Sequence, residues 1–156
     1  VKLSKQSCKI YGRGISGFKF KKNLVLDAGN SGTVGRLILP LLIKSPYKIK
    51  IIGDKSLSKR DFRRIIEPLS KFGAKFKINK GKHLPLTIFG SQKLKSINYI
   101  EKRGSAQCKS SVIFGGMRTN GTTKIRAKKS RNHTELLCKY LNLPISVEPP
   151  RLRVPK

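Results

Sequence analysis

Four short segments of this chain each combine a hydroxyl side chain with glycine, amide or basic groups. They are 30–33 (Asn-Ser-Gly-Thr), 58–60 (Ser-Lys-Arg), 105–107 (Ser-Ala-Gln) and 130–133 (Ser-Arg-Asn-His), and each precedes an apolar pattern with helical spacing. The first N–H groups of a helix lack intrahelical partners, and the helix dipole adds positive charge there. Helix starts therefore bind anions, and a nearby guanidinium adds two-point binding of phosphate or carboxylate. The four segments predict a site for an anionic ligand.

An ordinary N-cap is the competing interpretation of each segment, because Ser, Thr and Asn are the preferred capping residues. Their recurrence in two similar halves of the chain favours anion binding. Other chemistries lack support. There is no G-x-x-x-x-G-K-[ST] loop, no close pair of carboxylates and no Ser/His/Asp or Cys/His arrangement. His83 is predicted to lie on the surface, whereas His133 stands at a helix start.

The elements that must position these segments alternate between strand and helix. The helix after segment 30–33 is apolar nearly all round, which predicts burial, and Pro40 predicts a kink in it. In the first half we expect a strand at 24–26, a helix after 30–33, a strand at 48–52, a helix opened by Ser58 and ended by Gly73, and strands at 74–78 and 84–89.

The second half repeats this order. Ser31 and Ser105 are 74 residues apart, and Ser58 and Ser130 are 72 apart. The predicted fold is α/β, with two repeated β-α-β-α-β-β units at 24–90 and 91–156 packed as one lobe after a lead-in at 1–23. The nearly apolar first helix favours helices inside. The expected second-half elements are a strand at 97–100, a helix opened by Ser105, a strand at 122–126, a helix opened by Ser130, and strands at 145–147 and 152–154.

The charge balance also indicates an anionic partner. The 156 residues include 36 Lys and Arg against seven Asp and Glu, a net charge of +29. Nucleic acid and anionic small molecules both fit this charge, while a composition rich in Lys, Ile and Asn also fits a lysine-covered surface. Phe18 and Phe20, interleaved with lysines, are the best candidates for stacking on bases. No run approaches the ~18 apolar residues of a membrane span.

The cysteines indicate a reducing compartment. Cys8, Cys108 and Cys138 form neither an even set nor a metal-ligand spacing, so we expect buried, reduced thiols. No signal-peptide pattern follows Val1. The expected location is the cytoplasm, or the stroma of a plastid-type organelle in a eukaryote.

Six segments, in order, resemble those of the EPSP synthases, the enolpyruvyl transferases of the shikimate pathway. Together they extend over most of the chain, and their shared order makes the resemblance specific. The segments are Gly29-Asn30-Ser31-Gly32-Thr33-x-x-Arg36, Gly53-Asp54-x-Ser56-Leu57-Ser58-Lys59-Arg60, Arg64-Ile65-Ile66-Glu67-Pro68-Leu69 with Gly73-Ala74, Leu84-Pro85-Leu86-x-Ile88-x-Gly90, Ser105-Ala106-Gln107-x-Lys109-Ser110 and Ser130-Arg131-x-His133-Thr134-Glu135.

This resemblance implies a reaction in which phosphoenolpyruvate and shikimate 3-phosphate give 5-enolpyruvylshikimate 3-phosphate and phosphate. It implies no metal and no organic cofactor. Supporting positions would be Asn30, Ser31, Thr33 and Arg36. The resemblance assigns Gly32, Arg60 and Gln107 to phosphoenolpyruvate, and Ser105, Ala106, Gln107, Ser130 and His133 to shikimate 3-phosphate.

The chain departs from the family pattern in three ways. Asp61 stands where proline is usual, and its carboxylate is expected to weaken anion attraction at Arg60. Asn132 replaces an aspartate, which exchanges one capping residue for another. The chain is also far shorter than the two-lobed enzyme and lacks its N-terminal Lys-Ser-x-x-x-Arg segment and its other lobe, with the proton-transfer groups. We therefore expect a single lobe that binds shikimate 3-phosphate weakly, needs its complementary lobe and does not turn over alone.

Three rival hypotheses remain. An enolpyruvyl transferase acting on UDP-N-acetylglucosamine is disfavoured by the segments at 105–107 and 130–135. A basic, non-enzymatic RNA-binding domain of the same fold predicts tight, salt-dependent RNA binding that Gln107→Ala hardly changes, whereas the transferase lobe predicts only non-specific binding of nucleic acid. A degenerate lobe would fold without binding either substrate.

Overall fold

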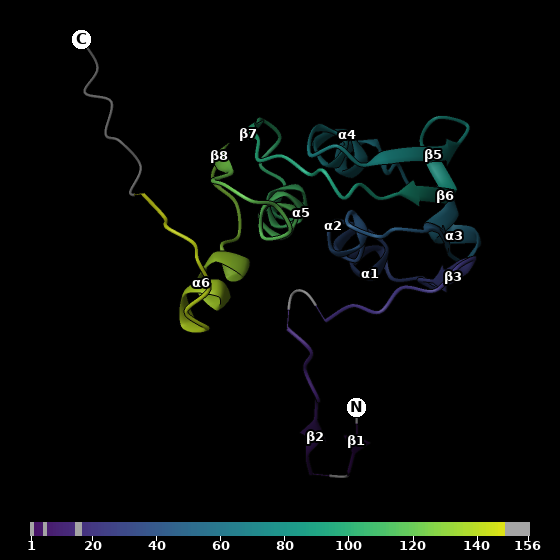
Figure 1. Ribbon diagram of the computed structural model, residues 1–156, viewed down its shortest axis with the longest axis horizontal. Coiled ribbons are helices and arrows are strands. Elements are labelled where there is room, and N and C mark those ends of the chain that lie inside the picture. The colour runs from purple at the N-terminus through teal and green to yellow at the C-terminus, as the bar shows by residue number, and fades with distance from the viewer. Residues whose placement is uncertain (1, 5, 15–16, 149–156) are drawn as a thin grey trace.

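The computed structural model describes residues 2–4, 6–14 and 17–148 (Figure 1). The chain begins with two short antiparallel strands, β1 (Lys2–Leu3) and β2 (Cys8–Lys9), which lie apart from the other elements. Cys8 is exposed, so the expectation of buried thiols is wrong there. Cys108 and Cys138 are buried, and all three thiols are free. No helix in the described part of the chain is long and apolar enough to cross a membrane.

The first half contains a four-stranded sheet of β3 (Leu24–Asp27), β4 (Lys48–Ile52), β5 (Lys75–Asn79) and β6 (His83–Phe89). Their order is β3-β4-β6-β5, with β3 parallel to β4 and the other pairs antiparallel. Side chains alternate across a strand, so Ile49 and Ile51 are fully buried while the lysines between them face solvent.

Pro40 divides the predicted first helix in two. α1 (Gly32–Leu37) begins at Ser31, whose hydroxyl accepts a hydrogen bond from the Val34 N–H at 3.1 Å. α2 (Leu39–Leu42) has Pro40 in its first turn. Backbone N–H groups there have no partner within the helix, so the missing N–H of proline costs no hydrogen bond. Leu39 and Leu42 are buried, but Val34 is half exposed, so α1 is less enclosed than its composition suggests.

The second predicted helix is also divided, and Ser58 does not cap it. α3 (Lys55–Ser58) begins at Asp54, whose carboxylate accepts from the Leu57 N–H at 2.7 Å. Ser58 closes this short helix and donates to the Gly53 carbonyl. α4 (Arg63–Lys71) follows without a side-chain cap, and Gly73 adopts a positive φ just after it, as predicted for the helix end.

The second half has a parallel strand pair, β7 (Asn98–Glu101) and β8 (Lys124–Ala127), with α5 (Ala106–Gly116) and α6 (His133–Tyr140). Ser105 caps α5 as predicted, whereas the N-cap position of α6 is Asn132 and not Ser130, and the Asn132 side chain makes no capping hydrogen bond. Residues 145–147 do not form the expected strand, and 152–154 lie outside the described residues. The full second repeat, and with it the division at residue 90, stays a prediction.

Helix α5 lies at the centre of the molecule. It contacts α1, α2 and α4 on one side and β7 and β8 on the other (Figure 1). The helices α1, α2, α4 and α5 therefore lie between the two sheets, as the first helix favoured, while α6 lies outside these layers. A methyl group on Gly115 would stand 2.8 Å from the Phe72 ring, so only glycine allows the end of α4 to pack this closely on α5.

A nearly buried ion pair joins α5 to α6. Lys109 and Glu135 are 2.5 Å apart, with side chains only 11% and 14% exposed. Beside them the hydroxyls of Ser110 and Thr134 share a hydrogen bond of 2.7 Å. Lysine and glutamate are costly to bury unless they are paired, so each depends on the other.

Glu135→Gln should therefore lower the free energy of unfolding by about 3 kcal/mol, because it leaves the Lys109 ammonium unpaired in a site that excludes water. Urea denaturation measures this loss. Replacing both partners with apolar residues, Lys109→Met with Glu135→Leu, should cost less than the single change. An equal or larger loss in the double variant would contradict this account of the pair.

Candidate functional site

A buried carboxylate fixes the turn that leads into α5. Glu101 is 2% exposed and accepts hydrogen bonds from the Arg103 N–H at 3.0 Å and the Ser105 N–H at 2.9 Å. The Ser105 hydroxyl then accepts from the Cys108 N–H. Glu101 is therefore occupied in holding backbone, and the first turn of an eleven-residue helix faces outward with a fixed geometry.

A pocket of about 490 Å³ opens at this helix start. Two of its polar atoms, Ser130 Oγ and Arg64 Nε, are buried and lack a hydrogen-bond partner among the described residues. Buried polar atoms normally have partners, so these two suit a ligand or ordered water in the pocket. The lining residues are Arg64, Arg103, Gly104, Ser105, Ala106, Gln107, Ser130 and Arg131.

The pocket unites most of the predicted shikimate 3-phosphate residues. Ser105, Ala106, Gln107 and Ser130 all line it, although they come from segments more than 20 residues apart. His133 does not line the pocket. It is the first residue of α6, and its side chain is exposed. Arg64, Arg103 and Gly104 were not predicted as site residues. Arg64 begins one of the segments that resemble the family, and that position could have indicated it as a site residue.

Arg36 orients the Gln107 side chain across 71 residues of sequence. Its Nη1 donates to Gln107 Oε1 at 2.7 Å, and Gln107 Nε2 donates to Thr33 Oγ1 at 3.3 Å. Arg36 is only 7% exposed, and its guanidinium carbon lies 5.7 Å from the centre of the Phe62 ring. The amide of Gln107 is thus held between α1 and α5.

Three guanidinium groups converge around this amide. Burial lowers the pKa of Arg36, and the positive charges of Arg64 and Arg60 lower it further. An arginine side chain stays protonated in a protein, so these groups repel one another. An anion placed among them would relieve that repulsion, which makes the cluster suited to phosphate or carboxylate.

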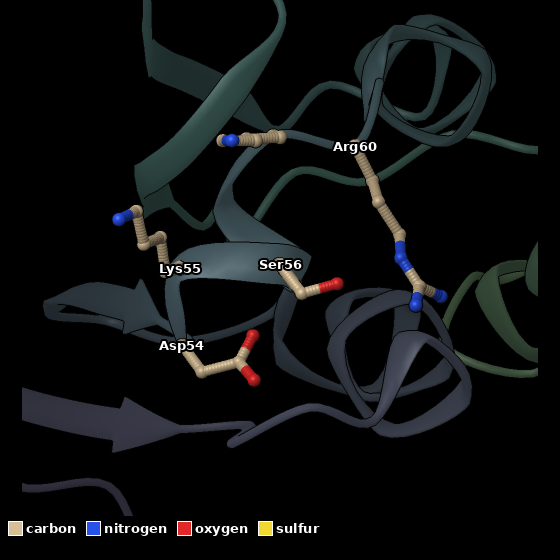
Figure 2. Close-up of a pocket in the computed structure, with 5 residues that line it drawn as sticks. Asp54, Lys55, Ser56 and Arg60 are labelled. Atoms are coloured by element: carbon tan, nitrogen blue, oxygen red, sulfur yellow. The ribbon is translucent and has the colours of Figure 1, made fainter.

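Gly32 allows Arg60 to reach the start of α1. A methyl group on Gly32 would stand 2.8 Å from Arg60 Nη1, so the guanidinium lies directly against the backbone there. Figure 2 shows Arg60 extending past Ser56, away from Lys55. A second pocket, of about 620 Å³, opens beside it and is lined by Asp54, Lys55, Ser56, Lys59 and Arg60. Gly32 and Arg60, two of the three residues predicted for phosphoenolpyruvate, thus lie together.

The supporting residues Asn30, Ser31 and Thr33 each form a hydrogen bond within the chain. Asn30 Nδ2 donates to Asp54 Oδ2 at 2.6 Å, which ties the loop before α1 to the start of α3. Ser31 caps α1, and Thr33 accepts from Gln107. Each of these three side chains already has a hydrogen-bond partner within the chain, which fits a supporting role.

Asp61 is directed at Arg63 and not at Arg60. Its carboxylate receives three hydrogen bonds from the Arg63 guanidinium, the shortest 2.6 Å, and one from the Arg63 N–H. The Arg63 hydrogen bonds lower the pKa of Asp61 to about 2. The expected weakening of Arg60 is therefore offset, because Arg63 neutralises the acid.

Comparisons with known proteins give a consistent result. Residues 1–154 match the family model of EPSP synthase (3-phosphoshikimate 1-carboxyvinyltransferase). A 3-phosphoshikimate 1-carboxyvinyltransferase of Clostridium tetani is 39% identical over 149 residues, 95% of this chain and 34% of the relative. One of Bacillus subtilis is 38% identical over 148 residues, 94% of this chain and 34% of that relative.

Solved structures agree with the sequence comparisons. An EPSP synthase from Acinetobacter baumannii superposes with a TM-score of 0.81 at 34% identity, covering 88% of this chain and 31% of that one. This likeness confirms the predicted α/β architecture as one lobe of that fold. The chain spans about a third of the length of the relatives it matches.

Inorganic phosphate should stabilise this chain more than sodium chloride of the same ionic strength, because phosphate fits among the converging guanidinium groups. We expect a melting temperature about 3 °C higher in millimolar phosphate than in matched chloride. The extra shift should be lost in Arg64→Gln. It should persist in Arg63→Gln, which removes the exposed neighbour paired with Asp61. Equal effects of the two salts would contradict the anion site.

Proposed function

Because this chain belongs to the EPSP synthase family, we propose that it supplies part of a site that transfers the enolpyruvyl group of phosphoenolpyruvate to shikimate 3-phosphate. The observation that carries this proposal is the group of arginines near the start of α5, where Arg36 holds Gln107 at the edge of the pocket that Arg64 also lines. Both substrates carry phosphate and carboxylate groups, which this cluster suits.

Shikimate 3-phosphate is assigned to the pocket at the start of α5. Its phosphate would accept hydrogen bonds from the first N–H groups of the helix and from the Ser105 and Ser130 hydroxyls. The unpartnered Ser130 Oγ and Arg64 Nε supply buried polar atoms for this group. His133, exposed at the start of α6, would contact this substrate only at the pocket's edge.

Phosphoenolpyruvate is assigned to Gly32 and Arg60. The glycine exposes the α1 backbone, and the Arg60 guanidinium lies against it, so a carboxylate or phosphate could bind both. Gln107 lines the pocket at the α5 start, and its amide also bonds Thr33, the neighbour of Gly32, so it would contact both substrates. Arg36 fixes the direction of its amide and so aligns the two reactants with each other.

Proton transfer must come from elsewhere. No carboxylate lines the described pocket at the α5 start. The nearby acids are engaged, since Glu101 holds backbone N–H groups, Asp54 caps α3 and Asp61 pairs with Arg63. This lobe would therefore bind and orient substrates, while proton transfer and exclusion of water would depend on the complementary lobe.

The exposed face of α6 supports an incomplete assembly. Leu136, Leu137 and Leu141 are each more than half exposed, and Tyr140 is 83% exposed. Four large apolar side chains on one short helix are unusual for a surface in water. We assign this face to contact with the remainder of the protein.

An NMR titration tests substrate binding. Shikimate 3-phosphate should shift the amides of 105–107 and 130–133, because its phosphate binds at the α5 start, and shikimate should shift them less. Binding at millimolar concentration is expected for half a site. Shifts scattered over the lysine-rich surface, or none at all, would favour the degenerate lobe.

Turnover is tested in a chimaera. The chain alone should release no phosphate from phosphoenolpyruvate and shikimate 3-phosphate, because the carboxylates near its pockets are engaged. Replacing the matching third of the Bacillus subtilis relative with this chain should give an active enzyme. Gln107→Ala in the chimaera should lower kcat/KM by at least about tenfold, since it removes a group shared by both substrates. Phosphate release by the isolated chain would show that proton transfer is not missing.

A further inference from the structure

The outer face of the four-stranded sheet carries two rows of lysines with a central aromatic residue. Strand β6 lies between β4 and β5, and the pairing places Phe89 between Lys48 and Lys75. The next pair along, Lys50 and Lys77, lies on either side of Thr87. All four lysines are exposed, while the residues between them on each strand face the helices and are buried or half-buried.

Strand geometry sets the spacing of these charges. Neighbouring strands are about 4.8 Å apart and alternate residues about 7 Å apart, so the lysine rows stand about 10 Å from each other. Exposed like charges at this distance repel one another weakly in water, and a bound anion would remove that repulsion. No ion pair to these lysines occurs among the described residues. Asp27, the acid on this face, lies at the end of edge strand β3, where its carboxylate accepts from the Gly29 N–H.

Phe89 offers an open ring between the lysine rows. It is 42% exposed, and Val25 on the edge strand is half exposed. Phe18 and Phe20, which the sequence suggested for this purpose, instead stack on each other at 6.4 Å, and Arg118 lies over the Phe18 ring. Bases stack on exposed aromatic rings, and lysines beside the ring neutralise the backbone phosphates.

We propose that this sheet face binds single-stranded nucleic acid without sequence preference, in addition to the transferase role. One strand would lie along β6, with a base on Phe89 and phosphates between the two lysine rows. The four exposed lysines and the exposed Phe89 ring favour a flexible polyanion with stacking bases over a folded acidic protein. The face points away from the helices, so the substrate pockets and Gln107 take no part.

Fluorescence anisotropy of the full chain with labelled oligouridine of roughly 20 nucleotides, and with oligo(dT), tests this proposal. We expect a dissociation constant of about 1 µM in low salt, rising steeply with salt. Replacing Lys48, Lys50, Lys75 and Lys77 with glutamine should weaken binding at least about tenfold. The same replacement should reduce the salt slope by about 0.7 for each phosphate that the lysines no longer neutralise.

The matched control removes the same charge elsewhere. Lys95, Lys102, Lys124 and Lys139 are exposed and lie on or beside β7, β8 and α6, and their replacement should weaken binding less than about threefold. Phe89→Leu should weaken binding about fivefold without changing the salt slope, whereas Phe89→Tyr, which keeps the ring, should not. Melting curves confirm that each variant is folded.

Three outcomes would overturn the proposal. They are the absence of binding in low salt, an equal loss in the two four-lysine variants, and equal binding by Phe89→Leu and Phe89→Tyr. Gln107→Ala should leave this binding unchanged, so failure here is distinct from failure of the proposed transferase role. Binding of oligouridine in preference to oligo(dT) would identify RNA as the partner, and equal binding would identify single strands in general.

Discussion

The burial of α5 on all sides is the constraint on which the rest of the structure depends. Its small residues let α1, α2 and α4 approach from one side and β7 and β8 from the other, with Gly115 directly beneath the Phe72 ring. Lys109, which also lies on this helix, is accommodated by Glu135 of α6. Packing along the whole length of α5, including its far end at Gly115, therefore fixes the position of its first turn at the site.

That first turn is where the cationic groups of both halves meet. Arg36 and Gln107 join α1 to α5, and burial lowers the pKa of Arg36, with the charges of Arg64 and Arg60 lowering it further. The core therefore forces like charges together, and an anionic ligand is the natural means of relieving their repulsion. The pocket has no carboxylate among its lining residues, which is consistent with the proposal that a chain one third as long as its relatives supplies only part of a site.

Side chains alternate between the two faces of the four-stranded sheet, so the lysines of β4 and β5 all lie on its outer face. On β4 and β5 every second residue is apolar and packs on the helices, and the residues between them are lysines. The same pattern that builds the core therefore builds a cationic outer face around Phe89. The net charge of +29 thus includes both an arginine cluster near the start of α5 and a lysine face on the outer side of the sheet.

The sequence by itself determined the features that depend on neighbouring residues. It showed the caps at Ser31 and Ser105, the strands of the first sheet, the helix end at Gly73 and the segments that identify the family. It did not determine that Ser58 and Ser130 are not caps, because capping depends on the backbone conformation that packing imposes. Nor could it show that Arg36 binds Gln107, that Arg64 lines the pocket or that Asp61 turns to Arg63. The pair of Asp61 and Arg63 is local, but the other two contacts exist because the burial of α5 brings distant helix starts together. Only the tertiary structure decides which side chains then meet.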